Sequence, residues 1–436
     1  INTMLYPTGE AEGFKIKKSK IRGVESFGML CAEDEIGIGT DHAGIILLPE
    51  DTPVGIPARE YYQIEDDYLL EIGLTANRAD AMSHYGVARD LAVYLQSHDM
   101  PYKLNLPDVS AFQAGNVTDK SVQVEVLNHE AAPRYMGLTI TGVKVAESPD
   151  WLKTRLRSIG LNPHNNVVDI TNFILHEIGQ PLHAFDANKI KGRKIVVRTC
   201  PEGTPFVTLD GVERKLSERD LMICDEEKPM CLAGVFGGLN SGVTEETTEV
   251  FLESAYFNPT SIRMTSRKLG LSSDSSYRFE RGVDRDMLEN ASSRAVSLIL
   301  ELAGGKLVSP LVKVATLKPE KPRILCHFSK ITSLLGMEVP NQRMVEIFRA
   351  LGLGVSDITD DTCLVTVPAF RADIRETADL AEEVARIHGL DKLPKIPVNA
   401  KRTVAFSSDA YAAMEQLRNQ FIAAGLCECV NTSLID

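Results

Sequence analysis

The sequence predicts a multidomain α+β protein, and three observations support that class. The chain has 436 residues, enough for about three domains that each bury a core. Alternating apolar segments at 1–62 and 122–126 predict strands, whereas 285–302 carries apolar residues at helical spacing. A Lys/Pro-rich segment at 317–322 predicts a linker between two units.

Composition excludes several other classes of protein. The contents of 44% hydrophobic and 25% charged residues are ordinary for a globular protein, and no apolar run is long enough to span a bilayer. The net charge of −13 argues against a wholly basic nucleic-acid coat but leaves room for local basic patches. The eight cysteines show no paired zinc-finger spacing, which favours reduced thiols in a cytoplasmic protein.

Changes of pattern along the chain predict five consecutive parts. They are part of a small β-barrel with one basic edge, a small α+β segment, a large α+β domain, a compact winged-helix-like domain, and the start of a further domain. The predicted boundaries are 1–62, 63–115, 116–317, 318–397 and 398–436. Both ends of the chain are expected to be cuts through a longer protein.

Periodicity predicts the main elements of these parts. The predicted helices are 150–158, 285–302, 331–335, 342–351 and 411–424. A short strand is predicted at 364–367, and the polar cluster at 168–173 is expected to follow a strand directly.

An acidic helix near the C-terminal end is the most informative segment. Asp379, Glu382, Glu383 and Arg386 recur at i, i+3, i+4 and i+7, which places three carboxylates on one face. Asp373, just before the helix, can converge on the same point. Oxygen ligands without nearby Cys or His suit Mg²⁺ or Ca²⁺ better than zinc. A solvated acidic face with Arg386 as an intrahelical partner is the alternative.

A second group of polar residues is a candidate site for a small substrate. His183, with Thr171 and Asn172 nearby in sequence, can orient a water or hydrogen-bond a ligand, although a structural histidine is the alternative. Glu253 interrupts an apolar strand and is either structurally paired or reserved for a polar ligand group. The glycines at 233–238 allow close backbone approach but match neither a Walker loop nor GxGxxG.

The chain has no evident nucleophile. Neither a Ser-His-Asp or Cys-His arrangement nor an HExxH motif is recognisable. Any hydrolysis would therefore depend on positioned water and electrostatics.

A basic edge lies in the first part. Its side chains are Lys15, Lys17, Lys18, Lys20 and Arg22. They either protect an edge strand from aggregation or contact nucleic acid.

Six motifs in this order closely resemble the β subunits of bacterial phenylalanyl-tRNA synthetases, across nearly the whole chain. They are 14–18 with 22–23 and 28–31, 75–80 with 86–90, 169–172 with 179–186, 234–238, 278–284, and 373–383.

The resemblance implies a domain order and partners. It implies a partial OB-fold for tRNA binding, a B1-like segment, a B3/B4 editing domain, a B5 domain and the start of a class II synthetase-like B6/B7 domain. The N-terminus and the C-terminal catalytic-like and anticodon-binding domains are expected to be missing. The implied partners are the α subunit, in an αββα heterotetramer, and tRNA(Phe), in the cytoplasm. ATP would be used by the α subunit and not bound by this chain, which alone should not charge tRNA.

The resemblance also implies site residues. The editing pocket, for hydrolysis of Tyr-tRNA(Phe), would be lined by Thr171, Asn172, His183, Gly234, Glu253 and Ala255. Mg²⁺, shared with the α subunit, would be bound by Asp373, Asp379, Glu382 and Glu383, which are expected to be solvent-exposed in this chain. The basic edge would contact tRNA phosphates. Two rival functions stay open: a tRNA-docking and assembly scaffold with a vestigial pocket, and a stand-alone Mg²⁺-dependent hydrolase.

Overall fold

The computed structural model describes residues 4–5, 14–39, 41–62, 68–110, 112–315, 321–393 and 408–429, with only the backbone described at 4–5 and 14–15. The chain divides into two compact units, residues 1–70 and 71–436, and each is described by itself.

The described part of the first unit contains short strands and no closed barrel. Strand β1 (Met4–Leu5) pairs with β2 (Phe14–Lys15), and β3 (Ser19–Ile21) forms a hairpin with β4 (Val24–Ser26). A 3₁₀ turn, η1 (Asp34–Ile36), and helix α1 (Ala58–Tyr61) follow. The predicted barrel is therefore not formed by these residues. The reason is that two-stranded hairpins enclose no core, and apolar side chains such as Leu30 and Leu47 stay exposed.

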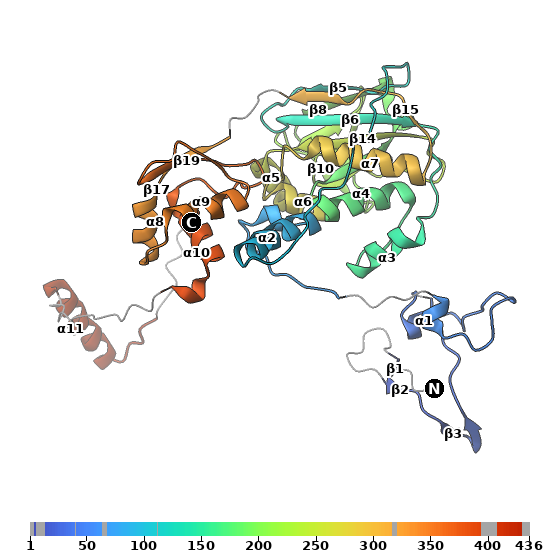
Figure 1. Ribbon diagram of the computed structural model, residues 1–436, viewed down its shortest axis with the longest axis horizontal. Coiled ribbons are helices and arrows are strands. Elements are labelled where there is room, and N and C mark those ends of the chain that lie inside the picture. The colour runs from blue at the N-terminus through green and yellow to red at the C-terminus, as the bar shows by residue number, and fades with distance from the viewer. Residues whose placement is uncertain are drawn as a thin grey trace. The chain divides into compact units, whose positions relative to one another are not determined.

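The second unit is built around a two-sheet sandwich (Figure 1). One antiparallel sheet has the order β15-β6-β14-β7, with β16 also pairing with β6. Its strands are β6 (Arg134–Thr141), β7 (Leu182–Asp186), β14 (Glu249–Tyr256), β15 (Lys306–Leu307) and β16 (Val312–Ala315). The central strands β6 and β14 are almost entirely buried, so both faces of this sheet are covered.

The other sheet has the order β13-β12-β11-β8-β5. Its strands are β5 (Gln123–Val126), β8 (Lys194–Thr199), β11 (Leu221–Cys224), β12 (Pro229–Leu232) and β13 (Phe236–Gly237). A hairpin of β9 (Pro205–Val207) and β10 (Glu213–Lys215) lies next to β13 through a bridge between Thr208 and Gly238. Phe185 and Phe251 of the first sheet share one core with Ile223 of the second.

Helices cover the other face of the first sheet, where a second core forms. Helix α4 (Asn166–Ile178) packs beside α7 (Leu288–Leu302) (Figure 1), and both contribute to a core with Leu138 and Leu252. The prediction of a strand just before 168–173 is wrong, because these residues lie inside α4. Asn165 caps that helix by accepting hydrogen bonds from the N–H groups of Val167 and Val168. The remaining elements around the sandwich are α2 (His84–Ser97), α3 (Asp150–Ser158), α5 (Pro259–Leu269), α6 (Asp274–Phe279), η2 (Ala79–Ala81), η3 (Ala187–Lys189) and η4 (Lys191–Arg193).

A C-terminal lobe has its own core. It contains the sheet β17-β19-β18 and three helices. Their bounds are β17 (Arg323–His327), β18 (Gly354–Ser356), β19 (Thr362–Thr366), α8 (Phe328–Leu335), α9 (Asn341–Ala350), α10 (Thr377–His388) and η5 (Leu390–Lys392). Helix α2 joins this core through Val93 and also contacts α4. Helix α11 (Asp409–Ala423) follows and buries none of its residues. Among the described helices, none has the length and apolarity required to cross a membrane.

Candidate functional site

Glu253 and His183 lie opposite each other in the first sheet. Strand β14 pairs antiparallel with β7, and the register makes these two residues direct partners. Because opposite residues point to the same face, both side chains face the space between the two sheets. The alternating neighbours Leu182 and Leu252 point instead into the core under α4. The register therefore brings together two of the residues that the resemblance implies for the editing pocket, and their part in such a pocket stays a prediction.

Glu253 is a buried carboxylate with one hydrogen bond among the described residues. Its side chain is almost wholly enclosed, and Tyr135 on β6 donates its hydroxyl to Oε2 at 2.5 Å. Burial raises the pKa of Glu253 to about 7, although the hydrogen bond from Tyr135 opposes this shift. A carboxyl group with a pKa near neutrality, in a dry site, is typical of a functional residue.

His183 is a neutral imidazole under physiological conditions. Its ring packs edge-to-face on Phe185, with centroids 4.4 Å apart. Burial lowers its pKa to about 4. The ring nitrogen Nε2 is buried and has no hydrogen-bond partner among the described residues. A ligand or an attacking water can form a hydrogen bond with such a nitrogen.

Two glycines of the 233–238 segment have different roles. A Cβ on Gly237 would lie 3.5 Å from Cε1 of His183 and closer still to Leu209, so its backbone borders the histidine directly. Gly234, the residue predicted for the pocket, is packed against Phe257 and Phe279 instead. Gly237 is thus the glycine of this segment that lies beside His183, and a part for Gly234 in the pocket stays a prediction.

The other predicted pocket residues divide between the two faces of the sheet. Ala255 is buried two residues from Glu253 on β14, and therefore shares its face. Thr171 and Asn172 lie on α4, which covers the opposite face, and the Thr171 hydroxyl donates to the Val168 carbonyl at 2.7 Å. A part for Thr171 and Asn172 in the pocket stays a prediction.

The acidic helix α10 is compensated by arginine. Arg371, 2% exposed, bridges Asp373 at 2.7 Å and Glu383 at 2.8 Å. Arg386 pairs with the same Glu383 at 2.7 Å, as the alternative interpretation of an intrahelical partner predicted, and also reaches Asp90 on α2. The expectation that the four carboxylates are exposed is wrong for Glu383, which is buried because two guanidinium groups neutralise it there. Asp373 and Asp379 are half-buried, and of the four Glu382 alone is exposed.

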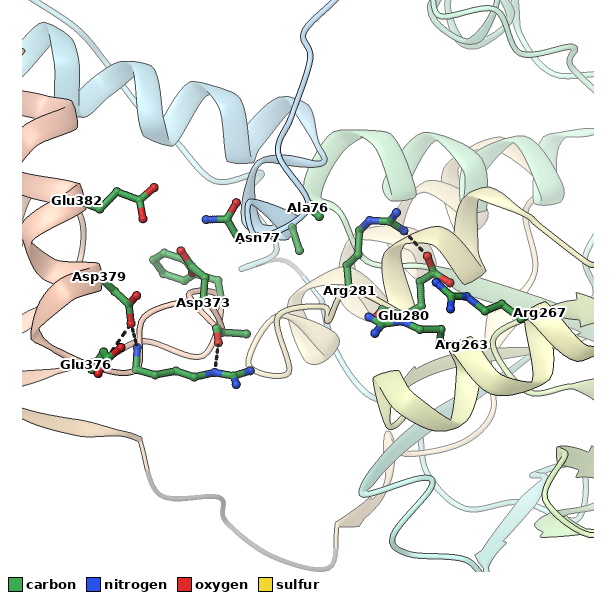
Figure 2. Close-up of a pocket in the computed structure, with 14 residues that line it drawn as sticks. Ala76, Asn77, Arg263, Arg267, Glu280, Arg281, Asp373, Glu376, Asp379 and Glu382 are labelled. Carbon is green, nitrogen blue, oxygen red and sulfur yellow. Dashed lines mark hydrogen bonds and ion pairs between the residues drawn. The ribbon is translucent and has the colours of Figure 1, made fainter. Parts of the chain in front are cut away.

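Three of the four carboxylates line a cavity of about 650 Å³. Figure 2 shows Asp373, Asp379 and Glu382 on one side of this cavity, and the arginines of α5 and the segment after α6 on the other. These arginines are Arg263, Arg267 and Arg281.

The carboxylates do not form a metal-ligand set as they are arranged here. Glu383 and Asp373 are ion-paired, Asp379 accepts the N–H groups of Arg375 and Glu376, and no described group of three acidic, His or Cys side chains can hold an ion. The oxygen chemistry suits Mg²⁺, but the Glu383 pairing does not.

Acid should weaken the lobe that holds Glu383. Burial alone would raise the pKa of Glu383, but hydrogen bonds from Arg371 and Arg386 outweigh it and hold the pKa at about 2. The pKa of Glu383 is lower in the folded than in the unfolded chain, so the ionised carboxylate stabilises the fold. This contribution is complete above about pH 5 and is lost as the pH falls towards 2. The free energy of unfolding should decrease by about 3 kcal/mol over this range. Hydrogen exchange of the α10 amides at pH 6, 4 and 3 measures the loss. Glu383→Gln should be less stable than the unmodified protein at pH 6 and should lose less stability as the pH falls. If the variant shows the same pH dependence as the unmodified protein, Glu383 is not its source.

The described basic side chains of the first unit are all exposed. Lys17, Lys18, Lys20 and Arg22 surround the β3–β4 hairpin, where Arg22 takes a left-handed turn conformation. Lys18 pairs with Glu25 at 3.1 Å and lies over the ring of Phe27. The side chain of Lys15 lies outside the described residues.

Comparisons with known proteins place both regions in recognised domains. A model of the B3/4 domain matches residues 131–304, which include His183 and Glu253. A model of the tRNA synthetase B5 domain matches residues 324–390, which include Arg371 and Glu383. The fold and the site therefore define a protein built from tRNA synthetase domains.

Curated relatives narrow this class to one family. The chain is 49% identical over 438 residues to the phenylalanine–tRNA ligase beta subunit of Bacteroides fragilis (strain YCH46), over all of this chain and 53% of that protein. The beta subunit of Salinibacter ruber is 46% identical over 393 residues, covering 88% of this chain and 47% of its own length. The chain belongs to the phenylalanine–tRNA ligase beta-subunit family and spans about half the length of these relatives.

A solved structure overlaps more weakly. An N-terminal fragment of the phenylalanyl-tRNA synthetase beta-subunit from Pyrococcus horikoshii covers 72% of this chain and 84% of its own, at 18% identity and a TM-score of 0.34.

Proposed function

We propose that this chain carries the editing site of a phenylalanyl-tRNA synthetase, which hydrolyses tyrosine from mischarged Tyr-tRNA(Phe). One observation supports this most: a buried carboxylate, Glu253, faces a neutral His183 across two paired strands inside the B3/4 match. Charging of tRNA(Phe) with phenylalanine, driven by ATP, is proposed for the α subunit.

Physical chemistry explains the need for such a site. A pocket shaped for a phenyl ring rejects a ring that merely adds a hydroxyl by only about a hundredfold. A second pocket, which forms a hydrogen bond with the tyrosine hydroxyl, supplies the remaining discrimination between tyrosine and phenylalanine. Buried hydrogen-bonding groups are suited to this, because an analogue without the hydroxyl leaves them unpaired.

The residues act by binding and orienting. Ionised Glu253 accepts the hydrogen bond of the substrate phenol, which phenylalanine lacks. His183, neutral and with an unpaired Nε2, holds the ester or the attacking water. Thr171 and Asn172 are proposed to assist. No step passes through a metal ion.

The partners and finer assignments are part of the same proposal. The α subunit in an αββα heterotetramer, tRNA(Phe) and a cytoplasmic location are proposed from the family. The exposed side chains Lys17, Lys18, Lys20 and Arg22 support phosphate contact in the first unit. A Mg²⁺ ion shared with the α subunit would require Glu383 to leave its arginines. We also propose that the B5 domain is winged-helix-like and that a class II synthetase-like domain begins after it.

Replacing Glu253 with alanine should abolish the preference for tyrosine. The measurement is deacylation of Tyr-tRNA(Phe) and Phe-tRNA(Phe) by the complete enzyme that contains the full β subunit. The ratio of the two rates should fall by about ten- to hundredfold, because a hydrogen bond to a charged group is lost.

Glu213→Ala, an exposed carboxylate on β10 of the same domain, is the matched control and should leave both rates unchanged. A preserved tyrosine preference in Glu253→Ala would show that Glu253 has no such role. Absence of deacylation by the unmodified enzyme would instead favour the scaffold with a vestigial pocket.

A further inference from the structure

Tyr135 is the residue that contacts the Glu253 carboxylate directly. It lies on β6, the neighbour of β14 on the side away from His183, and is fully buried. In the β6–β14 register Tyr135 is opposite Ala255, and Gly137 is opposite Glu253. Tyr135 therefore reaches Glu253 diagonally, on the same face of the sheet.

Only Oε2 of Glu253 is engaged by this contact. The tyrosine hydroxyl donates to Oε2 at 2.5 Å, and the described residues give the carboxylate no other hydrogen bond. Gly137 has no side chain with which to approach Glu253 from directly opposite, and the Phe251 ring fills the space where its Cβ would point. The carboxylate is thus fixed from one side, with Oε1 left for a ligand.

We propose that Tyr135 is a positioning residue, which fixes and ionises Glu253 so that Oε1 accepts the hydroxyl of a phenol-bearing substrate. This inference rests on the proposed function, because it concerns the same pocket. It adds a residue, on a third strand, that determines how Glu253 distinguishes tyrosine from phenylalanine.

Three titratable groups face Glu253, each from a different strand. They are Tyr135 on β6, His183 on β7 and Cys231 on β12. Burial lowers the pKa of His183 and raises the pKa values of Tyr135 and Cys231, so all three are neutral near pH 7. Cys231 directs its thiol to the carbonyls of Leu232 and Phe236. Among the described residues, the Tyr135 hydroxyl is therefore the group that stabilises the ionised form of Glu253, by donating a hydrogen bond to it.

Loss of that hydroxyl should change the pH dependence of discrimination. In the unmodified enzyme, the preference for Tyr-tRNA(Phe) should rise with a midpoint near pH 7, as Glu253 ionises. Without the stabilising donor the pKa of Glu253 is higher, so in Tyr135→Phe the midpoint should move up by about one pH unit or more. At pH 7 a shift of one unit should lower the preference by about fivefold, because the ionised fraction of Glu253 falls from about a half to about a tenth, and the preference should be recovered at higher pH.

The experiment uses the complete enzyme and measures deacylation of both charged tRNAs from pH 6 to 9. Tyr256→Phe is the matched control: Tyr256 is on the same strand as Glu253 and packs on the same core, and the described structure gives its hydroxyl no hydrogen bond. The control should keep the profile of the unmodified enzyme. As a readout that does not depend on activity, the infrared carbonyl band of protonated Glu253, assigned by its loss in Glu253→Gln, should titrate at higher pH in Tyr135→Phe.

Each outcome decides the inference. An upward shift of both the rate profile and the infrared titration supports it. Unshifted curves in Tyr135→Phe overturn it. If Glu253→Ala nevertheless abolishes the preference for tyrosine, the proposed function stands without the role of Tyr135. Absence of a tyrosine preference in the unmodified enzyme overturns both. If Tyr135→Phe fails to fold although Tyr256→Phe folds, the hydroxyl serves stability, and the positioning role is rejected.

Discussion

Replacing Arg371 with methionine should destabilise the C-terminal lobe by about 3 kcal/mol, because it removes the arginine partner of Asp373 and leaves buried Glu383 with Arg386 alone. Arg371 is 2% exposed and bridges Asp373 and Glu383. Burial alone would lower the pKa of the guanidinium, but the two carboxylates raise it above its ordinary value. Methionine keeps much of the side-chain volume, so the loss of stability measures the effect of removing the charge.

Hydrogen exchange of the α10 amides measures this loss, and Arg375→Met is the matched control. Arg375 is exposed, and among the described residues its side chain donates only to the Ala372 carbonyl, so its replacement should cost less than about 0.5 kcal/mol. Replacing both Arg371 and Glu383 with apolar residues should recover part of the stability, because the buried charge is removed. Equal protection in Arg371→Met and Arg375→Met would refute the bridging role.

Gly234→Ala should destabilise the sandwich by about 2–4 kcal/mol, from two effects that act together. Gly234 has a φ of +65°, a left-handed conformation that alanine adopts with strain. Its added Cβ would also lie 2.8 Å from Cδ2 of Phe257 and 2.9 Å from Cδ2 of Phe279, inside the core shared by the two sheets. Tight packing leaves these rings little room to move.

Gly211→Ala separates the two effects. Gly211 also has positive φ, +76°, but nothing lies within 4 Å of the position of its Cβ. This variant should therefore lose only about 1 kcal/mol, from the backbone alone. Trp151, the only tryptophan of the chain, reports urea unfolding of the sandwich by its fluorescence. Equal losses in the two variants would show that the Phe257 and Phe279 rings yield to the methyl group.

Local patterns in the sequence were enough to predict most helices. The predicted 150–158 coincides with α3, and 342–351 nearly coincides with α9. Helix α4 was missed because Val167, Val168 and Ile170 are β-branched and favour strands locally. Their burial against the first sheet, together with the Asn165 cap, overrides that preference. A barrel was predicted from short alternating segments, but alternation does not specify which strands pair.

By itself, the sequence determined the family resemblance, and it singled out Glu253, because an ionisable side chain inside an apolar strand is a local anomaly. Only the tertiary structure decided what these residues contact. Strand register brought Tyr135 to Glu253 across 118 positions of sequence, and the lobe's core placed Arg371 between Asp373 and Glu383. The physical reason is that charge compensation depends on distance in space and on exclusion of water, and both are set by packing between distant segments.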